Sequence, residues 1–535
     1  MIMADQRMRL GRLRGVNQER TGRQPDELAD ALNVIGEPEG FSVWGGRTRF
    51  SKGGLGKNWG LHHCVWPDKH ESLVVVGQWG VRAIEAGVIN DITGEGTGLK
   101  ILGGGLNPVH MTMFDLGRYL ILSYHNRNKV WAWDGNIDRP LEEVTVPDTM
   151  GFQVVEAWGS RLWGLGDEEH PLLAFYGDRN KLEIKAGQWL SFRDNPLASR
   201  LIGMRSVGRD TAFVWGDRGL WQVRYTGQWP LFVEPQLIYP DCDCISNNSI
   251  VSIPGIGYAW MGRRAVWMLR GDSIRRIDIS YDVSTKAYAE RRFDPRESSR
   301  LRDELAQIPL GSQHLVNGFW YRERNLAIWS YPTNACIEQH EWQNPRSIAY
   351  KPIDNSWWII GQGWQSVAEV VHNNQRLPVG TDQDGYLYLL DHNLVYDKIS
   401  EPVQWRAEYE WQGDPAIDAK WLNATLERPF QGAERVTARF WTRYQSSPPL
   451  ETYFSLREAY DDAAVPGGFD PGGPDDAGLP PGPIASITIP IRLRGPMIKI
   501  LLTNEYTDAN GNKKYYNGPA VPCSTLTLRA RMLRQ

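Results

Sequence analysis

One pattern of apolar and polar residues recurs along most of the chain, from about residue 51 to residue 400. Each repeat has an apolar run, a turn, and a second apolar run that often contains tryptophan. Short apolar runs between turn signals are typical of β-strands. The first runs of successive repeats are residues 73–76, 119–122, 161–164, 212–215, 258–261, 326–329 and 386–389.

The spacing of these repeats predicts a β-propeller. After Val74, the first runs are centred near residues 120, 162, 213 and 258, in steps of about 42 to 51 residues. Such a step matches one four-stranded blade, and the longer later steps indicate insertions. A lone blade cannot bury both faces, so the 24 tryptophans are expected to pack between blades. The alternative for the tryptophans is a ring that binds sugars, as in a lectin.

Two segments differ from this pattern. Residues 295–308, PRESSRLRDELAQI, predict a charged amphipathic helix inserted at the propeller surface. Residues 1–50 are expected to form an extended N-terminal arm, and residues 51–400 the propeller. Within the arm, only residues 26–34, DELADALNV, have a helical period.

After residue 400, apolar and polar positions alternate along longer segments, which is typical of half-buried strands. The clearest examples are residues 421–426, 436–441, 487–489, 497–502 and 526–532. Residues 401–535 therefore predict an antiparallel β-sandwich that follows the propeller, in an all-β protein. Residues 461–483, here called the acidic loop, have five aspartates and no basic residue, and are too rich in glycine and proline to form a core.

Composition adds limits on the class of protein. A chain of 535 residues indicates two or three domains. A net charge of −4 argues against a protein that binds nucleic acid mainly through phosphate contacts. Five cysteines are too few for a disulfide scaffold. The arginine-rich N-terminus has no apolar segment of signal-peptide length, and no window of the sequence predicts a membrane helix, so we expect assembly in a cytoplasm without stable membrane insertion.

Candidate chemistry is sparse. His62, His63 and Cys64 could supply metal ligands together with Cys242 and Cys244, but the CxC spacing is not that of a zinc finger or ribbon. Residues 167–170, DEEH, resemble a solvated charged turn more than an acid–base site. No nucleophile elbow, zinc-protease or phosphate-loop motif stands out. We therefore expect no metal site, no cofactor and no catalytic residues.

The order of motifs resembles the tail-nozzle, or packaged-DNA stabilisation, proteins of short-tailed bacteriophages. The resemblance rests on residues 201–204, AFVWGDRGLWQVRYTG at 212–227, the serine-containing segment 244–250 and AVWMLRGDSIRRIDIS at 265–280. It continues in the segment 349–358, AYKPIDNSWW, and in 492–500, RLRGPMIKI. It covers roughly residues 70–535, and the motifs are packing motifs, so no functional residue is carried over.

The resemblance implies a structural virion protein in a hexameric ring. Such a ring lies below the portal and adaptor proteins, contacts tail-fibre proteins, continues the DNA channel and retains the packaged genome until ejection. Double-stranded DNA would pass through it without sequence-specific binding. The protein would be located in the virion tail after assembly in the bacterial cytoplasm, and the ring would be heterologous and closed.

Two charged segments are candidates for roles in this assembly. The aspartates of the acidic loop would face the DNA lumen or the tail tip and repel or gate DNA: Asp461, Asp462, Asp470, Asp475 and Asp476. The N-terminal arginines would dock on a neighbouring subunit or the adaptor ring: Arg7, Arg9, Arg12 and Arg14. A mobile surface loop and a disordered terminus are the simpler interpretations.

Two other functions stay open. One is a different tail propeller, which anchors fibres or recognises the host, and its copy number and position in the particle would distinguish it. The other is a propeller enzyme or lectin that acts on carbohydrate. That function requires glycan binding or hydrolysis and carboxylates at the channel mouth.

Overall fold

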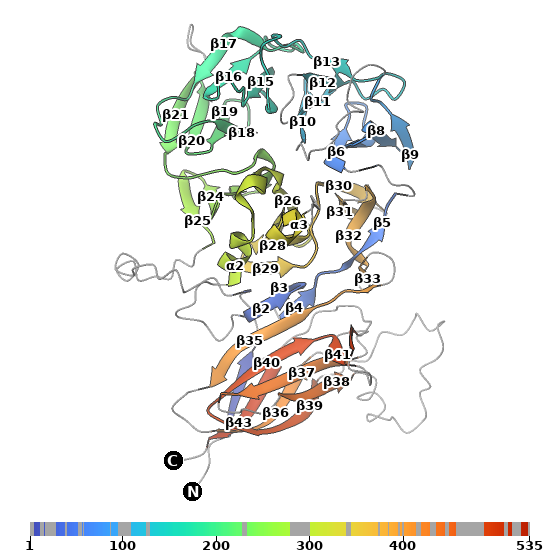
Figure 1. Ribbon diagram of the computed structural model, residues 1–535, viewed down its shortest axis with the longest axis vertical. Helices are drawn as coiled ribbons and strands as arrows, with labels where there is room; N and C mark the ends of the chain where they lie inside the picture. Colours follow the sequence, from blue (N-terminus) through green and yellow to red (C-terminus); the bar gives the residue numbers. More distant parts are fainter. Residues whose placement is uncertain are drawn as a thin grey trace.

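In the described part of the computed structural model, seven four-stranded antiparallel sheets are arranged as the blades of a propeller, and a β-sandwich with an eighth four-stranded sheet lies beside them (Figure 1). The structure describes residues 5–10, 15–16, 28–37, 40–51, 56, 58–85, 87–94, 109–124, 129–226, 233–278, 300–338, 344–372, 375–382, 385–393, 396–397, 401–413, 419–427, 435–443, 449–455, 486–507, 512–515 and 526–532. The prediction of an all-β protein with a propeller followed by a sandwich is confirmed.

The blades follow one another along the chain, and the strands within each blade pair in sequence order. Blade 1 contains β6 (Asn58–Val65), β7 (Glu71–Gly77), β8 (Gly80–Glu85) and β9 (Val88–Asp91). Blade 2 contains β10 (Val109–Phe114), β11 (Tyr119–Tyr124), β12 (Val130–Trp133) and β13 (Glu142–Glu143). Blade 3 contains β14 (Val154–Trp158), β15 (Arg161–Leu165), β16 (Leu173–Tyr176) and β17 (Lys185–Ser191). Blade 4 contains β18 (Leu201–Val207), β19 (Thr211–Gly216), β20 (Leu220–Tyr225) and β21 (Val233–Tyr239). Blade 5 contains β22 (Val251–Ile253), β23 (Gly257–Met261), β24 (Val266–Arg270) and β25 (Ser273–Arg276). Blade 6 contains β26 (Asn317–Tyr321), β27 (Leu326–Tyr331), β28 (Arg346–Lys351) and β29 (Ser356–Ile360).

The seventh blade combines strands from two distant parts of the sequence. It contains β30 (Val367–His372), β31 (Gln375–Thr381) and β32 (Leu387–Asn393), and its outer strand is β5 (Gly46–Arg49). The inner strands β6 and β30 are in contact, so the last blade adjoins the first and the ring is closed. Arg47 stacks on the ring of Tyr388 at 4.9 Å and Arg49 on that of Tyr386 at 3.7 Å, which fastens the closing strand to its blade.

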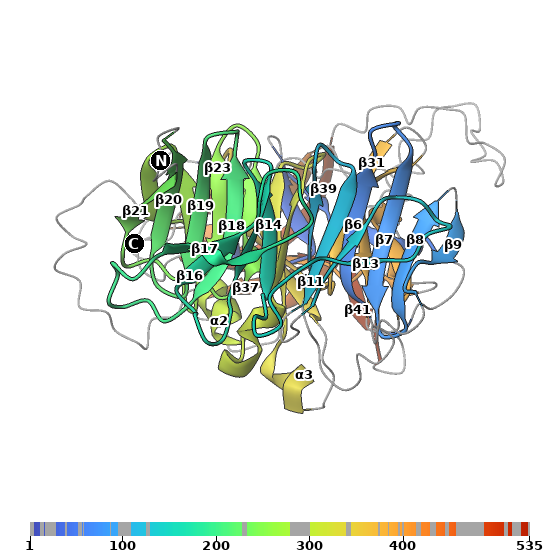
Figure 2. The same ribbon diagram turned by 90° about the horizontal axis from the view of Figure 1, so that it is seen from above.

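The runs recognised in the sequence are the middle strands of the blades, and they carry the core. Apart from one large cluster, each hydrophobic cluster joins two neighbouring blades, as between blades 1 and 2 or blades 4 and 5. Tryptophans are prominent among the fully buried side chains: Trp44, Trp133, Trp163, Trp215, Trp221, Trp260, Trp329, Trp357, Trp358 and Trp364. The expected packing of tryptophan between blades is therefore observed. In Figure 2 the strands of neighbouring blades stand side by side.

The sandwich is built from two sheets, and both include N-terminal strands. One sheet has the order β1 (Asp5–Leu10), β43 (Leu526–Met532), β36 (Ala419–Glu427) and β39 (Ser486–Arg494). The other has the order β2 (Leu28–Leu32), β35 (Arg406–Gly413), β40 (Met497–Thr503), β37 (Arg435–Thr442) and β38 (Leu450–Ser455). Short two-stranded sheets are β3 (Val34–Glu37) with β4 (Gly40–Val43), β33 (Tyr396–Asp397) with β34 (Glu401–Pro402), and β41 (Glu505–Thr507) with β42 (Lys513–Tyr515).

The N-terminal residues therefore run through both domains. β1 and β2 complete the sandwich sheets, the β3–β4 hairpin follows, and β5 closes the propeller. The helical interpretation of residues 26–34 is wrong, because residues 28–32 pair with β35 as a strand. Pairing in a buried sheet outweighs the modest helix propensity of this segment.

The two domains share one hydrophobic core. Its largest cluster combines residues of blades 5 to 7, the β3–β4 hairpin and both sandwich sheets. Phe41 packs against Trp405 at the junction, with ring centroids 5.9 Å apart. Asp30 forms ion pairs with Arg300 at 2.9 Å and with Arg406 at 2.6 Å, which adds charged contacts to the same junction.

Helices are few and short in the described part of the chain. Within the predicted insertion 295–308, the structure has the helix α2 (Arg300–Ala306), and residues 295–299 lie outside the described ranges. The other helical elements in the described part are the 3-10 turns η2 (Asn247–Ser249) and η3 (Leu310–Leu315) and the helix α3 (Asn334–Glu338). None of the helices in the described ranges is long and apolar enough to span a membrane.

Candidate functional site at the mouth of the propeller channel

The inner strand of the fifth blade differs from the others. β22 has only three residues, and the 3-10 turn η2 (Asn247–Ser249) precedes it. This turn contacts both β18 and β26, the inner strands of the neighbouring blades. Ser246 caps the turn by accepting a hydrogen bond from the Asn248 backbone N–H, and its hydroxyl donates to the carbonyl of Val316 at 3.0 Å.

Asn247 reaches from this turn to two other blades. Its side-chain oxygen accepts a hydrogen bond from Arg205 Nη1 at 2.8 Å, and Arg205 Nη2 also donates to its backbone carbonyl at 2.8 Å. Its amide nitrogen lies 2.8 Å from Nδ1 of His110 in blade 2. A Cβ at Gly203 would clash with Asn247, so glycine leaves the room that this side chain needs. The turn thus connects blades 2, 4 and 5 across the mouth of the channel.

Glu156 of blade 3 completes the network. Thr112 donates to its Oε1 at 2.9 Å, and the ring of His110 contacts its Oε2 at 3.2 Å. Arg205 Nη1 lies 3.5 Å from the same Oε2. With the backbone N–H of Ala157, which donates to Oε1 at 3.2 Å, the carboxylate has three hydrogen-bond partners and one cationic partner, and it is only 9% exposed, as a buried charge requires.

The partners fix the protonation of His110. Arg205 only donates, so Asn247 must turn its oxygen to Arg205 and its NH₂ to His110. His110 Nδ1 then accepts, and Nε2 carries the hydrogen donated to Glu156. Protonation would place two donors face to face at Nδ1. The arrangement thus holds His110 neutral and leaves its acceptor nitrogen occupied, so the ring is not poised as a general base.

Burial and neighbouring charges shift the pKa values in this network. Burial lowers the pKa of His110, and the charge of Arg205 lowers it further. Burial, followed by the proximity of His110 and His63, lowers the pKa of His62 to about 4. Burial alone would raise the pKa of Glu156, but the hydrogen bond from His110 and the charge of Arg205 outweigh it and bring that pKa below its ordinary value.

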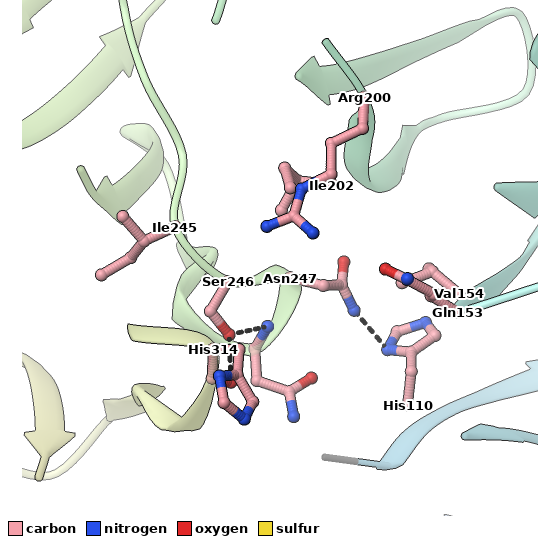
Figure 3. Close-up of a pocket in the computed structure, with 10 residues that line it drawn as sticks. His110, Gln153, Val154, Arg200, Ile202, Ile245, Ser246, Asn247 and His314 are labelled. Atoms are coloured by element: carbon pink, nitrogen blue, oxygen red, sulfur yellow. Dashed lines mark hydrogen bonds between the residues drawn. The ribbon is translucent and has the colours of Figure 1, made fainter. Parts of the chain in front are cut away.

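A small pocket lies beside the network, at the ends where the inner strands begin (Figure 3). Its lining comes from five blades: His110, Gln153, Val154, Arg200, Ile202, Ile245, Ser246, Asn247, Asn248 and His314. Its volume of about 40 Å³ is enough for roughly three water molecules. In Figure 3 the side chain of Arg200 extends toward Asn247 from the start of β18, and His110 approaches Asn247 from the opposite side.

The candidate metal ligands of the sequence do not come together. Cys64 lies in the cluster between blades 1 and 2, whereas Cys242 and Cys244 lie in the cluster between blades 4 and 5. Burial raises the pKa of Cys64 and of Cys244 to about 12, which keeps both thiols protonated. No group of three or more metal-ligating side chains occurs within the described ranges.

The other charged candidates lie in a turn of blade 3, in the sandwich strand β1 or outside the described part of the chain. Asp167 is buried and accepts hydrogen bonds from the backbone N–H groups of Gly151 and His170, so it stabilises a turn. Arg7 and Arg9 lie in β1, where they are paired in register with Arg529 and Thr527 of β43. The remaining candidate residues lie outside the described part of the chain: Arg12, Arg14, Asp461, Asp462, Asp470, Asp475 and Asp476.

Sequence reasoning missed the network because its members are dispersed. His110 and Glu156 are 46 residues apart, and His110 and Asn247 are 137 residues apart. No local motif links residues at such distances. The available signal was polar residues at alternate positions of inner strands, as at His110 and Thr112, where a core strand would be apolar.

The fold defines the class of protein: a seven-bladed β-propeller joined to a β-sandwich through a shared core. The sequence matches no protein-family model, and no curated protein is similar enough in sequence to match.

Solved structures with similarity to the chain include several propellers. The β-propeller domain of Cps50 (Swd1) from Myceliophteria thermophila is 10% identical, covers 64% of this chain and 99% of its own length, and has a TM-score of 0.34. A catalytically inactive virginiamycin B lyase from Staphylococcus aureus, crystallised with quinupristin, is 13% identical, covers 51% of this chain and 88% of its own, and has a TM-score of 0.27. PorZ, a surface component of the type-IX secretion system of Porphyromonas gingivalis, is 10% identical, covers 79% of this chain and 48% of its own, and has a TM-score of 0.33. At these scores the similarities carry no argument about function.

Proposed function

We propose that the chain is a structural subunit of the tail nozzle of a short-tailed bacteriophage. In this role it forms a hexameric ring below the portal and adaptor, contacts fibre proteins, and helps to retain the packaged DNA until ejection. The proposal rests on the sequence resemblance. It is supported by the positions of the resembling segments, which all form structural parts of the fold: β18, the turn η2, the hairpins β19–β20, β24–β25 and β28–β29, and the connection from β39 to β40 between the two sandwich sheets.

The closed mouth of the propeller bears on where DNA would pass. Asn247 of blade 5 and His110 of blade 2 lie 2.8 Å apart across the mouth and so join opposite parts of the ring. A double helix, whose major groove alone is about 12 Å wide, does not fit through such a mouth. The DNA channel of a nozzle would therefore lie on the axis of the ring of subunits, outside the propeller of each one. A net charge of −4 is suited to DNA that slides past without tight phosphate contacts.

We propose the same roles for the acidic loop and the N-terminal arginines, but the arginines would act from the sandwich. The aspartates of the acidic loop would face the DNA lumen or the tail tip. Arg7 and Arg9 belong to an edge strand of the sandwich, so a docking role for the N-terminal arginines would present that sandwich edge, and not a separate arm, to the neighbouring subunit or adaptor.

The proposal assigns no catalytic role to the chain. At the mouth of the channel, the polar groups of His110, Glu156 and Arg205 are hydrogen-bonded or ion-paired with one another and with Asn247. These groups are therefore already paired within the protein.

Particle composition tests the proposal. Quantitative mass spectrometry of purified virions, combined with gold-labelled antibodies in electron micrographs, should find about six copies per particle, all at the tail. A fibre or receptor-binding propeller would instead show a different copy number with label at the periphery. Absence of the protein from particles would contradict the proposal, and glycan-binding and hydrolysis assays would then be the next step.

A further inference from the structure

Two polar side chains at the channel mouth have no partner in the described part of the chain. The guanidinium of Arg200 makes no hydrogen bond or ion pair with any described residue, and neither does the amide of Gln153. Both side chains line the pocket, where in Figure 3 Arg200 extends toward Asn247 from above and Gln153 lies beside Asn247. Unused donors that converge on a pocket are the usual means by which a protein orients a polar ligand.

The pocket is lined by one cationic side chain, Arg200, and by no carboxylate. Among its ten lining residues, all of which are described, there is no aspartate or glutamate. Glu156 lies next to the pocket but is compensated by Arg205. Asp217 is close to Arg200 in the fold, but its oxygens accept from the backbone N–H groups of Ser199 and Arg200 and from the Ser199 hydroxyl. The Arg200 guanidinium therefore forms no ion pair with a carboxylate in the described part of the chain.

The size of the pocket and the residues that line it limit the class of ligand that it can bind. A pocket of about 40 Å³ accepts a group of a few heavy atoms. No tryptophan, tyrosine or phenylalanine is among the lining residues, so the stacking surface that a sugar ring would need is missing. We propose that this pocket binds a small oxyanion, a carboxylate or a phosphate group, through the guanidinium of Arg200 and the amide of Gln153. This site is independent of the role of the chain in a phage tail.

The test is calorimetric titration of the full chain with inorganic phosphate and, separately, with acetate, at an ionic strength held constant with chloride. A neutral disaccharide serves as the third probe. The variant Arg200→Gln removes the charge but keeps a polar side chain at an exposed position, so the fold is unaffected. Arg209→Gln is the matched control, because Arg209 is also exposed and lies at the opposite end of the β18–β19 hairpin.

We expect phosphate or acetate to bind, Arg200→Gln to weaken binding about tenfold or more, and Arg200→Lys to restore part of it. Arg209→Gln should leave the affinity unchanged. Preference for phosphate over acetate, or the reverse, identifies the source of the oxyanion. Crystals soaked in selenate should show an anomalous peak beside Arg200. Binding of neither anion, equal weakening by both glutamine variants, or binding of the disaccharide alone would each overturn the proposal.

Discussion

At the scale of single residues, the mouth of the propeller channel contains one buried carboxylate with three side-chain partners. Glu156 interacts with Thr112, His110 and Arg205, and Asn247 connects the last two. A buried ion pair contributes little beyond what apolar packing could provide, but removal of one partner leaves an uncompensated charge. The network therefore specifies which blades face each other more than it adds net stability.

Replacement of Glu156 by glutamine tests this account. Glu156→Gln keeps the size of the side chain but leaves Arg205 buried without a countercharge, so the free energy of unfolding should fall by about 3–5 kcal/mol. Glu143→Gln is the matched control, because Glu143 pairs with Lys129 at the surface of blade 2, and its loss should cost about 0–1 kcal/mol. Denaturant unfolding measures both values, and equal costs would contradict the role of the network.

The neutral histidines predict a dependence of stability on pH. The folded-state pKa of His62, about 4, lies below its ordinary value of 6.5, and that of His110 is also lowered. As the pH falls below about 6.5, the unfolded chain takes up protons that the folded protein refuses. Stability is therefore complete above that pH and is lost progressively toward pH 4, by at most about 1.4 kcal/mol per pH unit for each histidine.

The variant His62→Gln should have a shallower decline of stability between pH 6.5 and 4 than the unmodified protein. Unfolding free energies across this range provide the measurement. A decline of the same slope in the variant would show that His62 is protonated in the folded state.

At the scale of elements, the closure of the ring depends on the short strand β5 and on Asp391. Asp391 accepts a hydrogen bond from the backbone of Gly45 at 2.6 Å, just before β5, and another from Arg324 Nη2 of blade 6 at 2.8 Å. Tyr321 of the same blade also donates to it at 3.2 Å. One carboxylate, only 3% exposed, thus joins the closing strand to the sixth and seventh blades.

Asp391→Asn should loosen this closure. Asp391 has a φ of 55°, a left-handed conformation that asparagine also tolerates, so the substitution removes charge without backbone strain. We expect a loss of about 3–5 kcal/mol, since buried Arg324 loses its countercharge, and faster hydrogen exchange in residues 46–49. Asp115→Asn is the control, with a φ of 49° and a partner, Arg118, that is 70% exposed. If both variants exchange alike, Asp391 does not hold the strand.

At the scale of the whole molecule, the propeller and the sandwich share one core, and the N-terminal residues run through both. A domain with its own core unfolds separately, whereas a shared core couples the parts. Phe41 occupies this junction, fully buried on the β3–β4 hairpin and packed against Trp405. The two domains should therefore unfold together.

Calorimetry should show one transition, which the variant Phe41→Ala shifts to lower temperature without splitting it. The expected cost is about 3–5 kcal/mol, as for other large apolar side chains truncated in a core. Two separate transitions, or a shift confined to one of two, would contradict the coupling. Ile353→Ala, at a side chain that is 81% exposed, should leave the transition in place.

The middle strands of the blades could be predicted from the sequence, whereas the inner strands and the closing strand could not. Runs such as residues 73–76 and 212–215 revealed the blades, because buried middle strands are continuously apolar. The sequence did not predict the inner strand β10, VHMTMF, or the three-residue β22, because strands that line a polar channel are not continuously apolar. The closing strand β5 pairs with β32 across more than 300 residues, a contact that no local pattern encodes. The members of the polar network could not be predicted either, since they come from four different blades.

A cryo-electron microscopy reconstruction of the phage tail would test the central claim most directly. We expect about six copies of this chain in a closed ring below the adaptor, with DNA density on the ring axis and none through the propellers. The acidic loop should then face that axis or the tip, and the sandwich edge with Arg7 and Arg9 should meet a neighbour. A tail whose ring is made of another protein, with this chain absent or found only at the periphery, would contradict the account.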